Sequence, residues 1–371
     1  MAGALDGIVV ADFTRVLAGP YCTMLLADMG AEVIKVERPG SGDDTRSWGP
    51  PFDSDGRATY FEAVNRNKTS VAIDLAGGAG QRQARDLVER ADVLIENFAP
   101  GTLERFGLGW EQVHRHRPAL VYCSISGFGS GAGAELPGYD LLAQAVGGLM
   151  SVTGPHPDTP TKAGVAVTDV ITGLHATVGI LAALRHRDAT GNGQLVEVSL
   201  LTSLLSGLVN QTSAVLNGEV VPGITGNAHP SIVPYETYPT GDRQIVIAVG
   251  NDSQFRRLCR VLGSEEWADD PRFNTNPSRV QHRQELNPLL EQRLTLQPAD
   301  HWLPLLTAAG VPAGPINSVA EAIDLAAALG LDPVHEIDHP TRDRPFRTVA
   351  HPIRFSQTPA RYDTPPPPLP S

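Results

Sequence analysis

Asp169 is the residue of this sequence best suited to covalent chemistry. It lies in AGVAVTDVITGLHATVGILAAL, where strand-like alternation gives way to helical spacing, and it is the only formally charged side chain between Ala163 and Leu184. Burying a carboxylate costs free energy, so a buried one is expected to be hydrogen-bonded or to have a functional role. The backbone N–H groups and the dipole at a helix N-terminus keep such a carboxylate ionised. The same helix face carries Gly173, Ala176 and Ile180, which leave room for a ligand. Two interpretations stay open: a helix cap and a nucleophile.

Glycine-rich segments could support a nucleophilic role for Asp169. A carboxylate in a dry pocket can attack a thioester carbonyl, which forms a mixed anhydride and releases a thiolate. Backbone N–H groups must then stabilise the developing oxyanion. The segment GFGSGAG at residues 127–133 and the pair Gly147–Gly148 are candidates. Tight turns without a ligand explain both segments equally well.

Two arginines are candidate ligand-binding residues. Arg38 directly follows a predicted strand, where ligands bind in parallel sheets, and Arg105 lies on a short predicted helix after ENFAPG. Each of them also suits a solvated surface position. His114 and His116 do not share a helix face, and neither the other histidines nor the three cysteines have metal-ligand spacing, so we expect no metal.

The elements that must position these residues alternate between strands and helices. GIVVAD, AEVIKVE, TSVAIDL, DVLIENF and ALVYCSIS read as strands, with helices near residues 20–29 and in GQRQARDLVERA. This alternation predicts an α/β fold with a mostly parallel sheet and helices on both faces. After GQLVEVSLL we expect an apolar helix to about Leu216, a Gly/Pro-rich linker, and a smaller α+β unit near residues 225–330 that includes the hairpin YETYPTGDRQIVIAVGND.

Several classes of function are disfavoured. The first turn, TRVLAGP, contains Gly19 alone, so the GxGxxG pattern of nicotinamide enzymes is absent, and no GxSxG indicates an α/β-hydrolase. A net charge of −12 disfavours nucleic-acid binding. We interpret the apolar run 163–184 as a buried strand end and a buried helix rather than a membrane span. The N-terminus lacks a basic signal region, and Cys22, Cys123 and Cys259 suit free thiols in the cytoplasm.

Many short motifs in a fixed order carry a family resemblance. Most of residues 5–205 is similar to the class III CoA-transferases of the CaiB/BaiF, or formyl-CoA/carnitine CoA-transferase, type. The motifs are DFTRVLAGP, LADMGAEVIKVERPGSGDDTR, NRNKTSVAIDL, ADVLIENFAPGTLERFGL, SISGFG, PGYDLLAQAVGGLMSVTG and DVITGLHATVGILAALRHRDATGNGQLVEVSLL, with GNAHPSIVPYETYPT and GVPAGPINSVAEA later in the chain.

The resemblance implies a domain plan. It implies a large Rossmann-like CoA-binding domain at residues 1–215 and a linker with a small α+β domain at 216–330. A C-terminal segment at 331–371 is expected to return toward the large domain. The resemblance also implies an interlocked homodimer in the cytoplasm.

The resemblance further implies a mechanism and its ligands. Asp169 would be the nucleophile that takes CoA from an acyl-CoA donor to a carboxylic acid acceptor, through an aspartyl anhydride and an aspartyl-CoA thioester. No metal, nucleic acid or membrane takes part. Guanidinium groups suit phosphates, which gives the two arginines in the implied set a role. The implied CoA-contacting positions are Leu17, Ala18, Arg38, Ile73, Leu75, Asn97, Phe98, Arg105 and Tyr139.

The chain departs from the family pattern at three places. Leu17 replaces a Gln of the formyl-CoA enzymes, which disfavours formyl or oxalyl substrates. No glycine-run loop occurs between Asn217 and Tyr235, and the chain ends in PPPPLPS instead of a Leu-Gly-Glu-His-Thr-type segment with a final helix.

Two alternative functions remain. One is an α-methylacyl-CoA racemase of the same fold, in which a His stands where this chain has Tyr139. An ordinary tyrosine is a poor proton acceptor at neutral pH, so the transferase is favoured. The other is a non-catalytic acyl-CoA-binding homologue, against which the retained Asp169 speaks.

Overall fold

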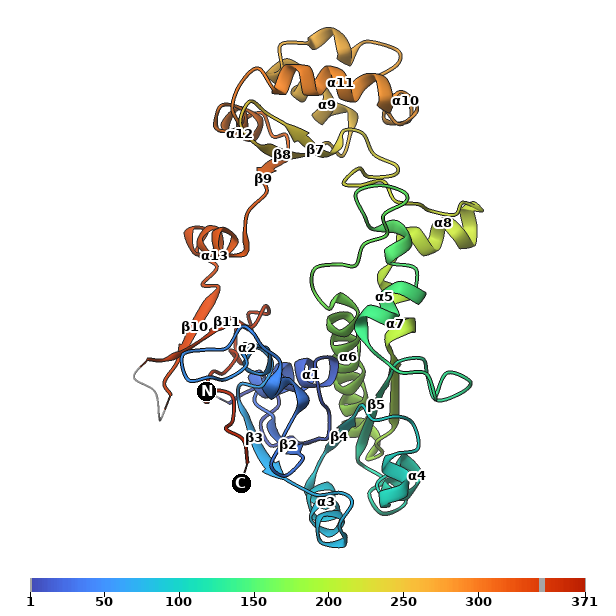
Figure 1. The fold of residues 1–371 in the computed structure, drawn as a ribbon, viewed down its shortest axis with the longest axis vertical. Coiled ribbons are helices and arrows are strands. Elements are labelled where there is room, and N and C mark those ends of the chain that lie inside the picture. The colour runs from blue at the N-terminus through green and yellow to red at the C-terminus, as the bar shows by residue number, and fades with distance from the viewer. Residues whose placement is uncertain (1, 340–343, 371) are drawn as a thin grey trace. The chain divides into compact units, whose positions relative to one another are not determined.

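The computed structural model describes residues 2–339 and 344–370, which form two compact units. The larger unit comprises the chain up to residue 150, residues 162–222, and the chain from residue 332 onward. The smaller unit comprises residues 151–161 and 223–331. Figure 1 follows the chain through both units by colour.

A six-stranded sheet forms the centre of the larger unit. All neighbouring strands are parallel, in the order β3-β2-β1-β4-β5-β6. The order reverses between β1 and β4, and in open parallel sheets ligands bind at the carboxyl ends of the strands beside such a reversal. The strands are β1 (Val9–Asp12), β2 (Glu32–Glu37), β3 (Lys68–Ala72), β4 (Val93–Glu96), β5 (Val121–Ser126) and β6 (Leu195–Ser199).

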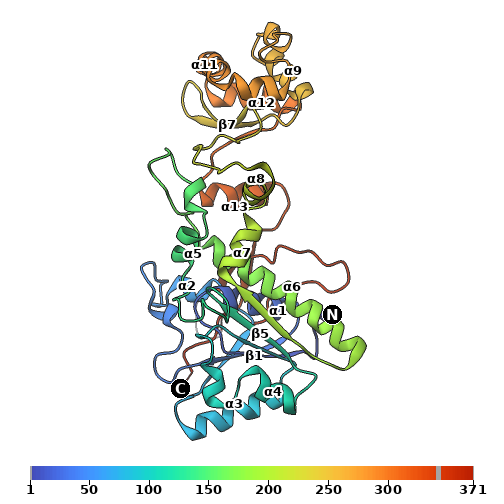
Figure 2. The same cartoon turned by 90° about the vertical axis from the view of Figure 1, so that its right-hand side faces the viewer.

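Helices cover both faces of this sheet (Figure 2). One face packs against α1 (Ala18–Asp28) and α6 (Val167–Thr190), and the other packs against α3 (Gly78–Arg90) and α4 (Trp110–His116). Because successive strand residues point to opposite faces, β5 places Cys123 in the first core and Tyr122 in the second. The predicted parallel α/β sheet is therefore confirmed.

Shorter elements complete the larger unit. They are η1 (Asp44–Ser47), α2 (Thr59–Glu62), η2 (Leu103–Phe106), α5 (Asp140–Val146), α7 (Leu200–Gly207), α8 (Asn210–Gly218), β10 (Val334–Ile337) and β11 (Phe346–Val349).

The smaller unit has a core of its own. Its antiparallel sheet, β7 (Tyr235–Pro239), β8 (Gln244–Ala248) and β9 (Ala313–Pro315), packs on helices through fully buried side chains such as Tyr238, Leu258 and Leu306. The predicted hairpin is present as β7 and β8. The helical elements are α9 (Asp252–Val261), η4 (Glu265–Ala268), α10 (Asn276–Gln281), α11 (Arg283–Leu294), α12 (Ala299–Ala308) and α13 (Val319–Ala328).

Two local predictions were wrong. The residues before α6 form a loop rather than a strand end. The apolar helix expected to reach Leu216 is divided into α7 and α8, because Val209 has a φ of 40° and a helix cannot continue through positive φ. Within the described residues, α6 alone has the length and apolar composition to cross a membrane, but Ala176, Ile180 and Ala183 along it are fully buried in the core.

Candidate functional site

A cavity of about 210 Å³ lies at the carboxyl ends of β4 and β5, beside the strand-order reversal. It brings together four residues of the predicted site: Ala18 at the start of α1, Asn97 and Phe98 after β4, and Asp169 on α6. The other lining residues are Ala99, Pro100, Ile125, Ser126, Gly127, Phe128, Gly129, Gly133, Ala134, Glu135, Leu136, Pro137, Gly138 and Leu200. The glycine-rich segment after β5 therefore borders the same cavity as Asp169.

Asp169 does not cap its own helix. Asp140, at the start of α5, accepts hydrogen bonds through Oδ1 from the backbone N–H groups of Thr168, at 2.9 Å, and of Asp169, at 3.2 Å. Ala166, at the N-cap position of α6, offers no capping side chain. No group in the described part of the chain donates a hydrogen bond to the Asp169 carboxylate, so the helix-cap interpretation is wrong.

A buried glutamine holds Asp140 in its capping position. Gln144 is fully buried, and its Nε2 donates to Asp140 Oδ2 at 2.6 Å. Its Oε1 accepts from the backbone N–H of Ala163 at 2.8 Å. The first turn of α5 is thus bonded both to the loop before α6 and to the amides of its first turn, which fixes the direction in which Asp169 leaves the helix.

Burial and a neighbouring charge make Asp169 a weak acid. Desolvation, and then the negative charge of Asp140, raise the pKa of Asp169 from 3.8 to about 7. Ionised and protonated forms therefore coexist near neutral pH, and the ionised form is more nucleophilic than an ordinary carboxylate. Burial, followed by the charges of Asp169 and Asp140, also raises the pKa of Tyr60 on α2. The Tyr60 phenol thus stays protonated in the field of both carboxylates, beside the ring of Trp48 at 5.3 Å.

A glycine brings α6 against the start of α1. A Cβ atom at Gly173 would lie 2.6 Å from the carbonyl oxygen of Ala18. Only glycine permits this approach, which places the second turn of α6 beside the first residue of α1. The small residues after Asp169 were expected to leave room for a ligand. In the structure Gly173 and Ala176 instead allow α6 to pack closely, because Gly173 contacts α1 and Ala176 lies in the core.

The remaining predicted CoA positions lie outside this cavity. Arg38 and Arg105 are exposed; Arg105 donates to Gly101 O and Thr102 Oγ1 of its own turn, each at 3.3 Å. Ile73 is a core residue and Leu75 packs against the same core. Leu17 and Tyr139 occupy the N-cap positions of α1 and α5, and Tyr139 is 63% exposed.

A buried charge network that the sequence analysis missed holds the loops at the carboxyl ends of β1 and β2. Lys35 Nζ lies 2.8 Å from Asp43 Oδ2 and donates to the carbonyl of Thr14 at 2.9 Å. Lys68 Nζ lies 3.4 Å from Asp12 Oδ2, and all four charged side chains are fully or almost fully buried. The signal for it was present, since charged residues interrupt the apolar strands VVAD and EVIKVE.

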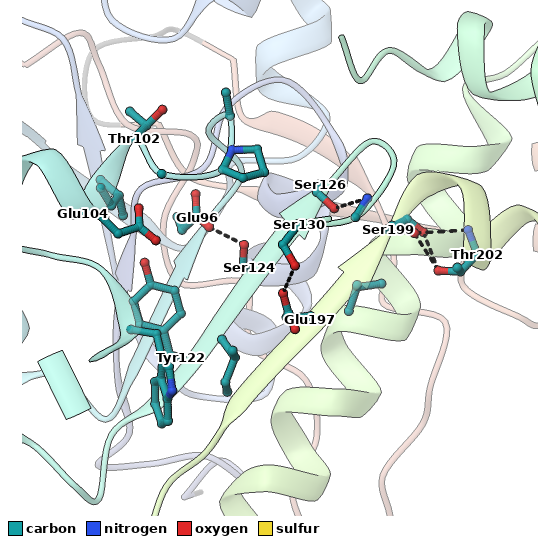
Figure 3. Close-up of a pocket in the computed structure, with 18 residues that line it drawn as sticks. Glu96, Thr102, Glu104, Tyr122, Ser124, Ser126, Ser130, Glu197, Ser199 and Thr202 are labelled. Atoms are coloured by element: carbon teal, nitrogen blue, oxygen red, sulfur yellow. Dashed lines mark hydrogen bonds between the residues drawn. The ribbon is translucent and has the colours of Figure 1, made fainter. Parts of the chain in front are cut away.

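A second cavity, of about 290 Å³, lies on the sheet face that Tyr122 occupies (Figure 3). It shares Ala99, Pro100, Ser126 and Gly129 with the first cavity. On this side the glycine-rich segment is fixed: Ser126 Oγ accepts from Gly129 N at 3.0 Å, and Ser130 Oγ donates to Glu197 at 2.8 Å.

The acidic lining of the second cavity disfavours anionic ligands. Glu96, Glu104 and Glu197 border it, and its lining contains no Lys, Arg or His. Burial raises the pKa of Glu96 to about 7. Both Glu96 oxygens already accept hydrogen bonds, from Ser124 Oγ and Phe98 N. Of the described residues, no group of three His, Cys, Asp or Glu side chains has the arrangement of a metal site.

Comparisons with known proteins identify relatives along the whole chain. Residues 5–370 match CoA-transferase family III. The succinyl-CoA:glutarate CoA-transferase of Mus musculus is 43% identical over 98% of this chain and 83% of its own length. The succinate–glutarate CoA-transferase of Agrobacterium fabrum is 45% identical over 98% of this chain and 92% of its own. A crystal structure of a CaiB/BaiF family protein from Brucella suis superposes with a TM-score of 0.87 at 42% identity and covers 100% of this chain and 97% of the other.

Proposed function

The chain belongs to CoA-transferase family III, and on that premise we propose that it moves CoA from succinyl-CoA to a dicarboxylate such as glutarate. The chain is a CoA-transferase, as its relatives over nearly its full length are. The choice of substrates rests on the names of two relatives above 40% identity. The apolar side chains of Phe128, Leu136 and Leu200 along the cavity suit a short methylene chain.

Asp169 is the nucleophile in this proposal. The observation that supports it is that Asp140, and not Asp169, caps α6. The ionised carboxylate attacks the thioester carbonyl, the carbon–sulfur bond breaks, and CoA leaves as a thiolate beside an acyl-aspartyl anhydride. The thiolate attacks the aspartyl carbonyl, which releases the donor acid and forms an aspartyl-CoA thioester. The acceptor carboxylate repeats the two steps in reverse order and leaves as the new acyl-CoA, which regenerates the Asp169 carboxylate.

Backbone amides of the glycine-rich segment would stabilise the oxyanions. Gly127, Phe128 and Gly129 border the cavity that contains Asp169, and the hydrogen bonds of Ser126 and Ser130 hold this segment from the opposite side. Donors that are already fixed in place need no reorganisation when charge develops on the carbonyl oxygen. The protonated phenol of Tyr60 is a second donor near the carboxylates.

The proposal includes a cytoplasmic homodimer with interlocked chains. Apolar side chains remain exposed on the elements around α6, and such patches suit a second copy of the chain. They are Leu141 and Val146 on α5, Leu174 and Val178 on α6, and Leu205 on α7. The three cysteines are buried free thiols, which suits a reducing compartment.

Mass spectrometry tests the reaction and the nucleophile together. Succinyl-CoA is mixed with glutarate, and the CoA esters are identified; we expect glutaryl-CoA and succinate. Intact-protein and peptide masses after incubation with succinyl-CoA should show CoA on the peptide that contains Asp169. Asp169→Asn should abolish transfer, whereas Asp188→Asn at the exposed end of α6 should retain it. Transfer by Asp169→Asn at the wild-type rate would refute the mechanism, and failure to form glutaryl-CoA from any donor would refute the acceptor.

A further inference from the structure

A proline-rich segment near the end of the chain lies on the larger unit and is fixed at its start. We call residues 363–370 the C-terminal tail. Asn67, just before β3, accepts through Oδ1 from the backbone N–H groups of Asp363 and Thr364, at 2.8 and 3.1 Å, and its own N–H donates to Thr364 O at 2.9 Å. Residues 365–368 are all prolines, which keep the backbone extended and carry no N–H group that could bond the carbonyls within the segment. The tail is therefore a stiff segment whose carbonyl groups can bind a neighbouring donor.

Arg46 is the donor that binds these carbonyls. Its Nη2 donates to the carbonyl oxygens of Pro367 and Pro368, each at 3.2 Å. The same guanidinium donates to both carboxylate oxygens of buried Glu37, at 2.7 Å, and its carbon lies 3.7 Å from the centre of the Phe61 ring. A planar guanidinium can make these contacts together, whereas a lysine ammonium cannot. Arg46 thus joins the C-terminal tail to β2 and to α2.

Arg46 and Phe61 adjoin two aromatic residues near Asp169. Phe61 directly follows Tyr60 in the single turn of α2, and Arg46 precedes Trp48 by two positions. The Trp48 and Tyr60 rings pack edge to face, with centres 5.3 Å apart, and the charge of Asp169 acts on the Tyr60 phenol. Phe61 is only 4% exposed, so a shift of α2 would disturb its packing against the guanidinium. The position of Tyr60 therefore depends on where Arg46 is held.

We propose that Arg46 is a positioning residue of the transferase, and that the C-terminal tail holds it where it keeps the Tyr60 phenol beside Asp169. The inference rests on the proposed function, in which this phenol is a donor near the reacting carboxylate. Neither Arg46 nor the tail lines the cavity that contains Asp169, so their effect passes through Phe61. Without the proline carbonyls, Arg46 still binds Glu37, so the fold is kept while α2 loosens.

A double-mutant cycle between the tail and Tyr60 tests this coupling. A chain that ends at Thr364 keeps the bonds to Asn67 but loses both carbonyls that bind Arg46. Its kcat for CoA transfer should fall about tenfold, the equivalent of one hydrogen bond to a charged group, with little change in the KM of the acyl-CoA. Tyr60→Phe should lower kcat by a similar factor, and the two changes combined should lower kcat no further. A loss through general destabilisation would instead multiply with the loss in Tyr60→Phe.

Hydrogen exchange followed by mass spectrometry gives a readout that does not depend on activity. The amides of residues 42–62 should exchange faster in the shortened chain than in the full-length protein, whereas those of α6 should be unchanged. Asp6→Asn is the matched control, because it removes the ion pair with Arg361 shortly before the tail and leaves Arg46 untouched. It should alter neither kcat nor the exchange of residues 42–62.

Arg46→Lys separates the role of the guanidinium from that of its charge. The ammonium can still pair with Glu37 but cannot also reach the tail, so this variant should reproduce the kinetics of the shortened chain. Three results would each overturn the inference and leave the transferase proposal intact: unchanged kcat in the shortened chain, unchanged exchange at residues 42–62, or losses that multiply with Tyr60→Phe. Absence of CoA transfer by the wild-type protein would overturn the proposed function, and the inference with it.

Discussion

Replacing Asp140 by Asn tests how the charge next to Asp169 controls its reactivity. The Asn Oδ1 can still accept from the amides of Thr168 and Asp169, so the cap on α6 is kept while its charge is removed. The pKa of Asp169, about 7 against an ordinary 3.8, corresponds to roughly 4 kcal/mol against ionisation. Burial is the larger cause and Asp140 the smaller, so the charge of Asp140 accounts for less than about 2 kcal/mol of it.

The sign of the pH effect follows from the ionised form being the nucleophile. In the wild type, kcat/KM should fall as the pH drops through about 7. In Asp140→Asn the fall should occur at lower pH, by less than half of the interval between 3.8 and about 7. The ratio of variant to wild-type activity should therefore be higher at pH 6 than at pH 8, where the less basic carboxylate is also the weaker nucleophile. Tyr60, whose pKa is raised in part by the charge of Asp169, remains neutral across this pH range, and Glu135 lines the same cavity as Asp169.

The assay is a stopped-time measurement of acyl-CoA exchange across this pH range, with Asp140→Ala as the comparison. Ala removes both the charge and the cap, and should lower stability by about 1 kcal/mol through loss of the cap. In Asp140→Asn the new NH₂ group lies opposite Gln144 Nε2, so two donors face each other and a small loss of stability is expected. Neither amide titrates, so this loss of stability has no pH dependence between pH 6 and 8. If kcat/KM of Asp140→Asn falls at the same pH as in the wild type, or at a higher pH, the charge of Asp140 does not act on Asp169.

Three further predictions concern stability. Gly173→Ala should lower the free energy of unfolding by about 1–3 kcal/mol, because its Cβ meets backbone of α1 that cannot move away, whereas Gly164→Ala has open space and should be neutral; urea denaturation measures both. Arg66→Ala should cost about 3–5 kcal/mol by leaving buried Asp28 unpaired. Burial already raises the pKa of Asp28, so this loss should shrink as the pH falls through that raised value and the carboxyl becomes neutral; a loss that is constant with pH would contradict the assignment. Leu258→Ala should cost about 2–5 kcal/mol in the core of the smaller unit, and limited proteolysis should then cleave that unit before the larger one.

Local patterns in the sequence were sufficient to predict the parallel α/β sheet, but they left Asp169 open between a helix cap and a nucleophile, and the family resemblance favoured the nucleophile. Alternating strands and helices specify a parallel sheet because crossover helices are needed to return the chain to the same edge. Burying a single carboxylate within a long apolar run costs free energy wherever the run folds. The sequence therefore singles out this position even though its spatial neighbours are unknown. The break at Val209 was not predictable in this way, since a β-branched residue rarely adopts a positive φ and its type therefore gave no signal of a break.

Only the tertiary structure decided what surrounds that carboxylate. The cap on α6 comes from Asp140, 28 positions before Thr168. The backbone N–H of Arg15, shortly after β1, donates to the side chain of Asn97, 82 positions later in the chain. Both interactions are hydrogen bonds between segments that are adjacent only after the sheet has ordered them. The sequence therefore determined which groups are costly to bury. The folded chain determined which of them have a hydrogen-bond partner and which, like the Asp169 carboxylate, have none among the described residues.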